Sequence, residues 1–299
     1  MGSALIRTAG VSTKLHVATR SELNLESYID VLKFLDTKQP DEIILAAARV
    51  GGIAANSKYQ MNFLLDNLKI QNAVIEAAAK LQIPRLIFLG SSCIYPKLAP
   101  QPISENSLLS GFLEPTNEGY ALAKIAGVRL CKAVFEEHNL KYFSLMPTNL
   151  YGPKDNYNLE SGHVPASLMR KFHEAKISKN PEVVVWGTGL PRREFMHVDD
   201  LASACWYLLG QEVGGELINV GTGSDIEIRE FAALMAKVVG FNGKITYDSS
   251  RPDGTPRKLL DVSKIHSLGW NHKIELAEGL KRTYEWFTSA ISKGEVRGY

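Results

Sequence analysis

Short runs of apolar and β-branched residues alternate with longer amphipathic segments through the first half of the chain. Four of the short runs predict strands, at residues 14–19, 42–47, 85–89 and 142–146. Between the second and third runs, residues 61–80 place apolar side chains at helical spacing, and Pro84 follows their end. This alternation predicts an α/β fold, in which a doubly wound parallel sheet carries helices on both faces.

The second half of the chain predicts a smaller, mixed α/β domain. Residues 182–186 and 216–220 have strand patterns, whereas 228–239 and 275–289 have helical patterns. Another helix is expected after His197, with Asp199 or Asp200 as its N-cap. We expect this domain to pack over the strand ends of the first, where such sheets bind ligands, and residues 293–299 to be frayed.

Composition and charge exclude several classes of protein. The 299 residues are 45% hydrophobic and 22% charged, which is typical of a folded chain with one large or two unequal domains. Lys and Arg number 34 against 32 Asp and Glu, so charge gives no reason to expect a nucleic acid or membrane partner. Three scattered cysteines predict neither a disulfide framework nor a metal site, and they favour the reducing cytoplasm.

Candidate chemistry lies at the end of one predicted strand and the start of one helix. Tyr120 and Lys124 are four residues apart and share a helix face, and a fixed cation near a phenol favours proton exchange near neutral pH. Strand 85–89 runs into Gly90-Ser-Ser-Cys93, which puts hydroxyls and a thiol where this sheet binds ligands. Each motif alone also fits an ordinary helix face or a turn. Together, Ser91, Tyr120 and Lys124 resemble the proton-transfer group of short-chain dehydrogenases/reductases.

Seven longer motifs narrow this resemblance. They are LAAARVGGI at 45–53, GSSCIYPK at 90–97, EPTNE at 114–118, MPTNLYGP at 146–153, VVVWG at 183–187, REFMHVDD at 193–200 and PDGTPRK at 252–258. In this order the chain resembles the GDP-L-fucose synthase family over about residues 2–287. The resemblance implies an NADPH-dependent 3,5-epimerisation and 4-reduction of GDP-4-keto-6-deoxy-D-mannose to GDP-L-fucose, performed by a homodimer.

The resemblance also implies a division into domains. A Rossmann-like NADP-binding domain would comprise residues 1–155 with 195–221, and a GDP-sugar-binding domain residues 156–194 with 222–290. Residues 291–299 would form a tail.

The resemblance assigns roles to five catalytic candidates. Cys93 and His163 match an acid/base pair that exchanges protons beside the 4-keto group. Tyr120, with Ser91, would bond the C4 oxygen and donate a proton to it during reduction. Lys124 would lower the pKa of Tyr120 and hold the nicotinamide ribose. In the alternative without a catalytic role, Cys93 is a small buried apolar residue and His163 is a surface histidine. We interpret Cys131 and Cys205 as small buried apolar residues.

Further positions are implied for the two ligands. Arg20 would bind the 2′-phosphate of NADP. The other cofactor positions are Gly2, Ser21, Glu22, Leu23, Asn24, Leu25, Leu89, Gly90, Ser91, Ser92, Lys124, Pro147, Thr148, Asn149, Leu150 and His163. The substrate positions would supply cations for the pyrophosphate and an aromatic surface near the nucleotide. They are Asn149, Lys171, Trp186, Arg193, Asp253 and Lys258. Each of these alone would also fit a solvated surface residue.

The chain departs from the family at two places. Residues 1–299 begin at the last glycine of the family's Gly-x-x-Gly-x-x-Gly turn, so its first strand and most of that turn are not in the sequence. We favour a start codon assigned too far downstream over two alternatives, rescue by another subunit and an inactive truncated paralogue that retains a GDP-sugar pocket. Gly119 replaces a larger residue, which we expect to loosen the start of the catalytic helix or the sugar pocket. A related reductase of a further deoxygenated GDP-4-keto sugar is the remaining alternative.

Overall fold

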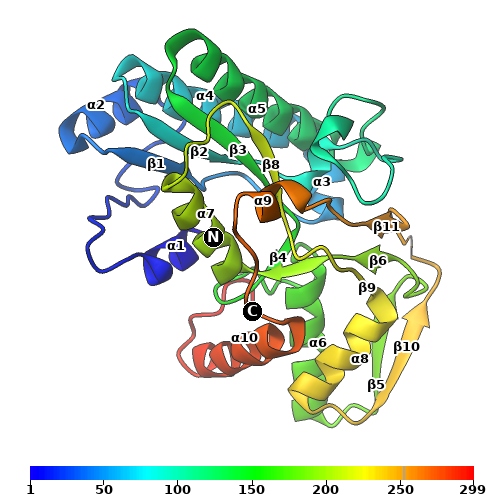
Figure 1. Ribbon diagram of the computed structural model, residues 1–299. Helices are drawn as coiled ribbons and strands as arrows, with labels where there is room; N and C mark the ends of the chain where they lie inside the picture. Colours follow the sequence, from blue (N-terminus) through cyan, green and yellow to red (C-terminus); the bar gives the residue numbers. More distant parts are fainter. Residues whose placement is uncertain (252) are drawn as a thin grey trace.

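Four parallel strands form the central sheet of the computed structural model, which describes residues 1–251 and 253–299 except the side chains of residues 53 and 54. Their spatial order is β1 (Glu42–Leu45), β2 (Arg85–Leu89), β3 (Lys141–Pro147) and β8 (Leu217–Val220) (Figure 1). The middle strands β2 and β3 are buried along almost their whole length, as expected of parallel strands covered on both faces. The strands expected at 42–47, 85–89, 142–146 and 216–220 are confirmed, with slightly different ends.

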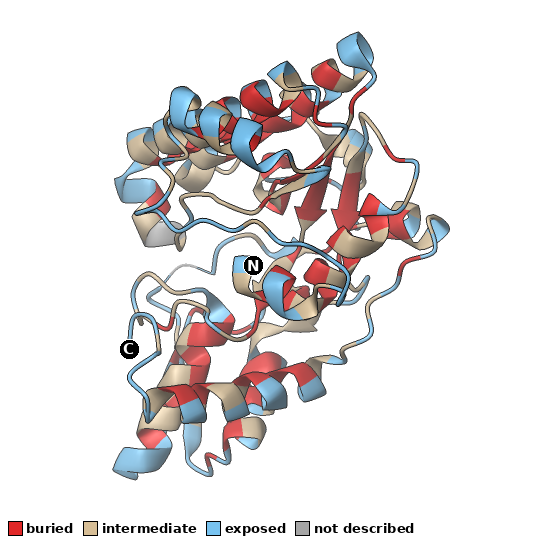
Figure 2. Cartoon of the chain, turned by 90° about the vertical axis from the view of Figure 1, so that its left-hand side faces the viewer, coloured by how far each residue is buried: buried red, intermediate tan, exposed pale blue. Residues whose placement is uncertain are grey.

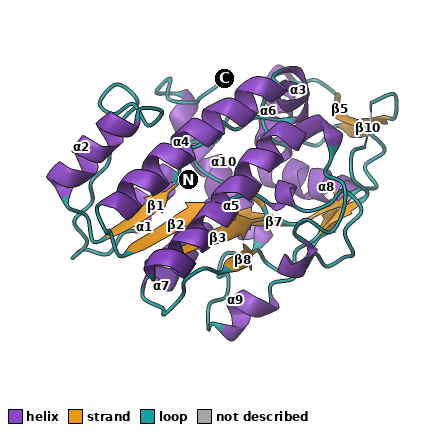
Figure 3. Ribbon diagram, turned by 90° about the horizontal axis from the view of Figure 1, so that it is seen from above, coloured by secondary structure: helices purple, strands orange, loops and turns teal. Residues whose placement is uncertain are grey.

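Helices cover both faces of this sheet (Figure 3). One face carries α2 (Tyr28–Lys38), α4 (Gln60–Lys80) and α5 (Glu118–His138), and the other carries α1 (Gly2–Thr8) and α7 (Val198–Leu209). Helices α4 and α5 pack against each other, and α1 packs on α7. The layers confirm the predicted α/β fold with a doubly wound parallel sheet.

Residues 14–19 do not form the strand that their pattern predicts. They belong to the extended connection between α1 and α2, where the side chain of Val17 is 64% exposed. Within the part of the chain that the structure describes, β1 pairs with β2 alone, and its other edge has no strand beside it. The prediction is wrong because an alternating segment becomes a strand only where a sheet edge pairs with its backbone.

A second hydrophobic core lies apart from the sheet (Figure 2). Helices α6 (Val164–Ser178), α8 (Ile228–Val239) and α10 (Leu276–Ile291) pack with the parallel pair β5 (Glu182–Trp186) and β10 (Lys244–Asp248). Phe172, Phe231 and Phe287 are fully buried in this core. The strand expected at 182–186 and the helices expected at 228–239 and 275–289 are confirmed.

Short elements connect the two cores. Strand β4 (Asn149–Tyr151) pairs with β7 (Phe195–His197), and β6 (Arg192–Arg193) lies between β9 (Ile226–Glu227) and β11 (Arg257–Lys258). The remaining short helices are α3 (Ile53–Lys58), α9 (Ser263–Ser267), η1 (Ser92–Ile94), η2 (Glu105–Ser107) and η3 (Pro115–Asn117). Leu260, Val262, Ile265 and Trp270 pack in the first core, although the expected division put 222–290 in the second domain.

Two smaller predictions are wrong. Helix α7 is capped by His197, whose Nδ1 accepts the N–H of Asp199 at 3.2 Å, so both aspartates lie inside the first turn. The tail is held against the second core, because Arg170 donates to the carbonyl of Gly298 at 2.6 Å and its guanidinium lies 4.8 Å from the ring centre of Tyr299.

Across 1–251 and 253–299, no helix has the length and apolarity needed to cross a bilayer.

Candidate active site

Lys124 projects from α5 to the carboxyl end of β2. Its Nζ donates to the carbonyl of Leu89 at 2.8 Å and lies 5.8 Å from the centre of the Tyr120 ring. The side chain is buried, and this burial lowers the pKa of Lys124 to about 7. The strand end and helix face expected from the sequence therefore meet around a buried amine.

Tyr120 lies beside Ser91. Burial and the nearby Cys93 raise the pKa of the Tyr120 phenol, while the nearby Ser91 side chain acts in the opposite direction. The role expected of Lys124, to lower this pKa, stays a prediction. Burial disfavours the phenolate, and it also lowers the pKa of Lys124 and so reduces its positive charge near neutral pH.

Cys93 joins the same group through Ser91. The Oγ of Ser91 accepts the N–H of Cys93 at 3.3 Å, which caps η1. On its other side, the Sγ of Cys93 lies 3.6 Å from Nζ of Lys258, a residue that we expected at the nucleotide. Cys93 is only partly buried, whereas Cys131 and Cys205 are fully buried, as we interpreted them.

His163 is exposed at the N-terminus of α6. Among the described residues, no hydrogen bond joins His163 to Cys93. The loop before His163 is tied to the start of α3, because the N–H of Gly52 donates to the carbonyl of Ser161 at 3.2 Å. Burial raises the pKa of the nearby Asp155 carboxyl, and the charge of His163 partly offsets that rise.

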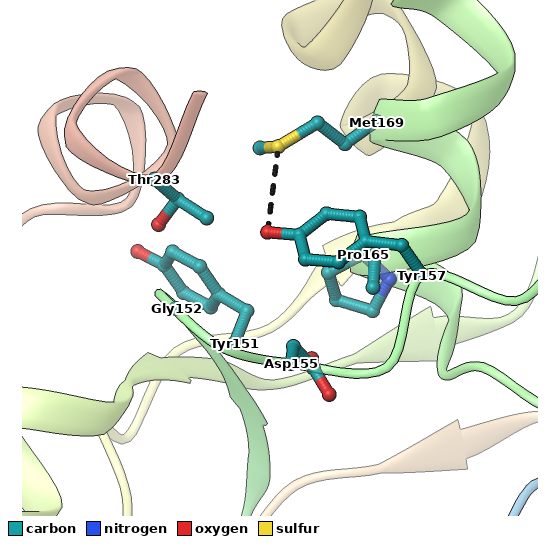
Figure 4. A pocket seen from close by; sticks show the side chains of 8 residues that line it. Tyr151, Gly152, Asp155, Tyr157, Pro165, Met169 and Thr283 are labelled. Atoms are coloured by element: carbon teal, nitrogen blue, oxygen red, sulfur yellow. Dashed lines mark hydrogen bonds between the residues drawn. The ribbon is translucent and has the colours of Figure 1, made fainter. Parts of the chain in front are cut away.

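Behind this loop, a small gap opens into the second core (Figure 4). The Tyr157 hydroxyl points at the sulfur of Met169, 4.0 Å away, and the Tyr151 hydroxyl faces Thr283. The gap has no room for a water molecule, so it is a packing defect rather than a ligand site.

Residues expected at the nicotinamide end lie at the ends of two neighbouring strands. Leu89, Gly90 and Ser92 follow β2, and Pro147, Thr148, Asn149 and Leu150 follow β3. Thr148 Oγ1 and Asn149 Nδ2 donate to the same carbonyl, that of Glu194, at 3.2 and 2.8 Å. A Cβ at Gly90 would overlap the end of the Met146 side chain, which would then have to move.

Residues expected at the adenosine end lie on a tight turn before α2. The Glu22 carboxylate accepts the N–H of Thr19 at 2.7 Å, which lowers the pKa of Glu22. Ser21 hydrogen-bonds Thr19, and Leu23 and Leu25 pack against the first core, while Arg20 and Asn24 are exposed. Gly2 is exposed at the start of α1. Within the described residues no carboxylate pairs with Arg20, so its guanidinium is available to a phosphate.

Basic side chains surround Trp186, which is 50% exposed. The Nζ of Lys171 lies 4.7 Å from its ring centre and the guanidinium of Arg251 lies 5.1 Å from it. Sequence reasoning missed Arg251, although it stands just before the motif that begins at residue 252.

Arg193 and Asp253 lie close enough together for their charges to interact. Burial lowers the pKa of Arg193, and the charge of Asp253 acts to raise it. The Asp253 carboxylate also accepts the N–H and the hydroxyl of Thr188 at 2.7 and 2.8 Å. Asp253 thus holds the loop that follows β5.

Sequence reasoning also missed the buried carboxylate of Glu194, between β6 and β7. It accepts the N–H groups of Thr222, Gly223 and Leu260 at 2.6, 2.8 and 3.1 Å. Burial raises the pKa of Glu194, and these hydrogen bonds oppose the rise. The sequence did contain a signal for this residue, because Glu194 is an acidic residue within the pattern of a buried strand.

Groups of three or more His, Cys, Asp or Glu side chains that could hold a metal ion are absent from the residues that the structure describes.

Comparisons with known proteins identify relatives of this chain. Residues 3–221 match the NAD dependent epimerase/dehydratase family. The chain is 54% identical over 295 residues to a probable GDP-L-fucose synthase 1 of Oryza sativa subsp. japonica, covering 97% of this chain and 90% of the rice protein. It is 51% identical over 283 residues to the GDP-L-fucose synthase of Escherichia coli strain K12, covering 92% and 88%.

A solved structure is similar over the same length. The GDP-L-fucose synthetase of Naegleria fowleri bound to NADP superimposes with a TM-score of 0.91 at 26% identity, covering 98% of this chain and 91% of that one. The chain therefore belongs to the GDP-L-fucose synthases within the NAD dependent epimerase/dehydratase family.

Proposed function

We propose that the protein is a GDP-L-fucose synthase, which uses NADPH to convert GDP-4-keto-6-deoxy-D-mannose to GDP-L-fucose by 3,5-epimerisation and 4-reduction. Identity above 50% with two such enzymes supports this function. One observation supports the mechanism: Cys93 and Ser91 both lie close enough to Tyr120 to shift the pKa of its phenol, so a proton-exchanging thiol and a proton-donating phenol would share one site. Both reactions can then occur without release of the intermediate.

The residues present fit NADPH at both of its ends. Lys124 uses one N–H on Leu89, which leaves donors for ribose hydroxyls beside Tyr120. Arg20 offers a guanidinium to a 2′-phosphate. The turn at Ser21 to Leu25 would surround the adenosine, and residues 147–150 would lie beside the nicotinamide. When bound, NADPH supplies the hydride that reduces C4.

Epimerisation needs proton removal at a carbon beside the ketone and proton return on the opposite face. We assign these two tasks to Cys93 and His163. Ser91 and Tyr120 would hydrogen-bond the C4 oxygen and stabilise the negative charge of the enolate. In the reduction step the Tyr120 phenol gives its proton to the C4 oxygen, and the raised pKa in the free protein keeps that proton in place.

The nucleotide part of the substrate would occupy the region of Trp186. Lys171, Arg193 and Arg251 supply cations for the pyrophosphate, and the exposed ring of Trp186 offers an apolar surface to the nucleoside. Asn149 would contact the sugar, and Asp253 would hold the loop around it.

We further propose a homodimer whose subunits meet on α4 and α5. These adjacent helices expose Met61, Leu65 and Leu122, which are 69%, 43% and 44% exposed. Side chains of this kind on neighbouring helices suit helix packing between two copies.

The two cores suggest a cofactor domain built on the sheet and a substrate domain built on α6, α8 and α10. The three free thiols fit the reducing cytoplasm, where we place the protein.

Product analysis tests the proposed function. The purified chain is incubated with NADPH and GDP-4-keto-6-deoxy-D-mannose, and in parallel with a GDP-4-keto sugar that lacks one more hydroxyl. We expect GDP-L-fucose from the first substrate, identified by NMR. NADPH oxidation with the second substrate alone would instead identify the related reductase. A chain that binds the GDP-sugar without binding NADPH would be a non-catalytic binding protein.

A further inference from the structure

We propose that Lys258 is a positioning residue that holds the sulfur of Cys93 in its thiolate form for proton abstraction. The inference rests on the proposed function, because it names what activates the base of that reaction. It also changes the role of Lys258, which the resemblance assigned to the nucleotide.

The contact between the two side chains is direct. Nζ of Lys258 lies 3.6 Å from Sγ of Cys93, and both residues are half-buried. A thiolate rather than a thiol accepts a proton, and an adjacent ammonium favours the thiolate. The interaction is stronger in a partly buried site than in bulk water.

The cation of Lys258 faces the sulfur of Cys93. Within the part of the chain that the structure describes, Lys258 forms no ion pair with a carboxylate. Its neighbour Arg257 points elsewhere and pairs with Asp225. The two consecutive cations of β11 thus have different partners: Arg257 contacts the Asp225 carboxylate, and Lys258 contacts the Cys93 thiol.

The backbone around Lys258 is fixed from several sides. Its carbonyl accepts the N–H of Glu194 at 3.3 Å, and the N–H of Leu260 donates to the Glu194 carboxylate at 3.1 Å. The intervening N–H, that of Leu259, donates to Oε1 of Gln101 at 2.9 Å. Such anchoring fixes the backbone position from which the Lys258 side chain reaches Cys93.

The proton transfer balances without any further reactant. The hydrogen leaves the carbon beside the ketone and forms the S–H bond of Cys93, while the C–H electron pair enters the enolate. Lys258 keeps its proton throughout and acts by its charge alone.

Thiol alkylation tests the inference without requiring turnover. Iodoacetamide is added at pH 7, and mass spectrometry follows the peptide that contains Cys93, since the other two cysteines are fully buried. We expect Lys258→Met and Lys258→Gln to slow alkylation of Cys93 at least about tenfold, because the thiolate is the reacting form. Lys258→Arg should restore most of the rate, and Arg257→Met, which removes the neighbouring cation, should leave it unchanged.

Equal alkylation rates in the folded wild type, Lys258→Met and Lys258→Gln would overturn the inference. It would also be overturned if Arg257→Met slowed alkylation of Cys93 as much as Lys258→Met does. Circular dichroism confirms that each variant is folded. Failure of the proposed function is a separate outcome: a wild type whose Cys93 depends on Lys258 but which makes no GDP-L-fucose would keep the pairing and refute the activity.

Discussion

Gln60 and Gly119 join the start of α4 to the start of α5, directly before Tyr120. The N–H of Gly119 donates to Oε1 of Gln60 at 3.0 Å, and Nε2 of Gln60 donates to the carbonyl of Pro115 at 2.7 Å. A Cβ at position 119 would lie 2.7 Å from the backbone oxygen of Gln60. The absence of a side chain at position 119 therefore allows this close contact between the two helices, while the expected loosening of the catalytic helix or the sugar pocket stays a prediction.

A side chain at position 119 should break this contact. Gly119→Ala is expected to lower the free energy of unfolding by about 1–2 kcal/mol, since steric cost exceeds the gain of about 0.5–1 kcal/mol from alanine in a helix. Urea unfolding measures the change. Gly111→Ala is the matched control, because a Cβ there would meet only Pro96 at 3.4 Å and fits without strain. Equal stability of the two variants would argue against the contact.

The buried amine of Lys124 should make stability depend on pH. Its pKa is about 7 in the folded chain against the ordinary 10.5, so between these pH values the unfolded chain binds more protons. The free energy of unfolding of the wild type should then rise with pH relative to Lys124→Gln, by at most about 1.4 kcal/mol per pH unit. Below pH 7 the difference between the two proteins should be constant. Urea unfolding from pH 6 to 9.5 measures it, and a difference independent of pH would contradict the burial effect.

The Glu194 carboxylate should be essential to the packing at the end of β8. Glu194→Ala leaves the N–H groups of Thr222, Gly223 and Leu260 without their acceptor, so we expect a loss of more than about 3 kcal/mol. Glu182→Ala, which removes an exposed carboxylate from β5, should change stability little. Thermal unfolding compares the two. Similar melting temperatures would show that the buried carboxylate does not hold these loops.

The proposed dimer should depend on the exposed apolar face of α4 and α5. Leu122→Lys places a charge in that face and should convert dimers to monomers, which light scattering after size exclusion detects. Ile177→Lys on α6 is the control, since its side chain is also exposed, at 68%, but lies on another helix. An unchanged dimer in Leu122→Lys would reject this face as the interface.

Local sequence patterns were sufficient for most elements of the fold. The apolar run at 85–89 is buried on both faces as β2, and the periodic segment at 61–80 is α4. The pattern at 14–19 misled because strand formation depends on a partner that the segment itself does not encode. The prediction of a frayed tail was wrong because the residue that holds the tail, Arg170, lies far away in the sequence.

The site could be predicted only in part. Ser91, Tyr120 and Lys124 follow from one strand end and one helix face, which local patterns identify. The contact of Lys258 with Cys93 spans 165 residues, and it depends on the register of β11 against β6. Spacing along the chain carries no signal of such a contact, nor of Arg251 beside Trp186.

The central claim is that one site uses Cys93 for epimerisation and Tyr120 for reduction. The most direct test runs Cys93→Ser and Tyr120→Phe in D₂O with NADPH and GDP-4-keto-6-deoxy-D-mannose, and NMR then follows deuterium at C3 and C5 while absorbance follows NADPH. The account predicts that Cys93→Ser mainly loses deuterium incorporation and that Tyr120→Phe mainly loses NADPH oxidation, by about 100-fold or more for a general acid. Rapid deuterium incorporation by Cys93→Ser, together with undiminished NADPH oxidation by Tyr120→Phe, would contradict it.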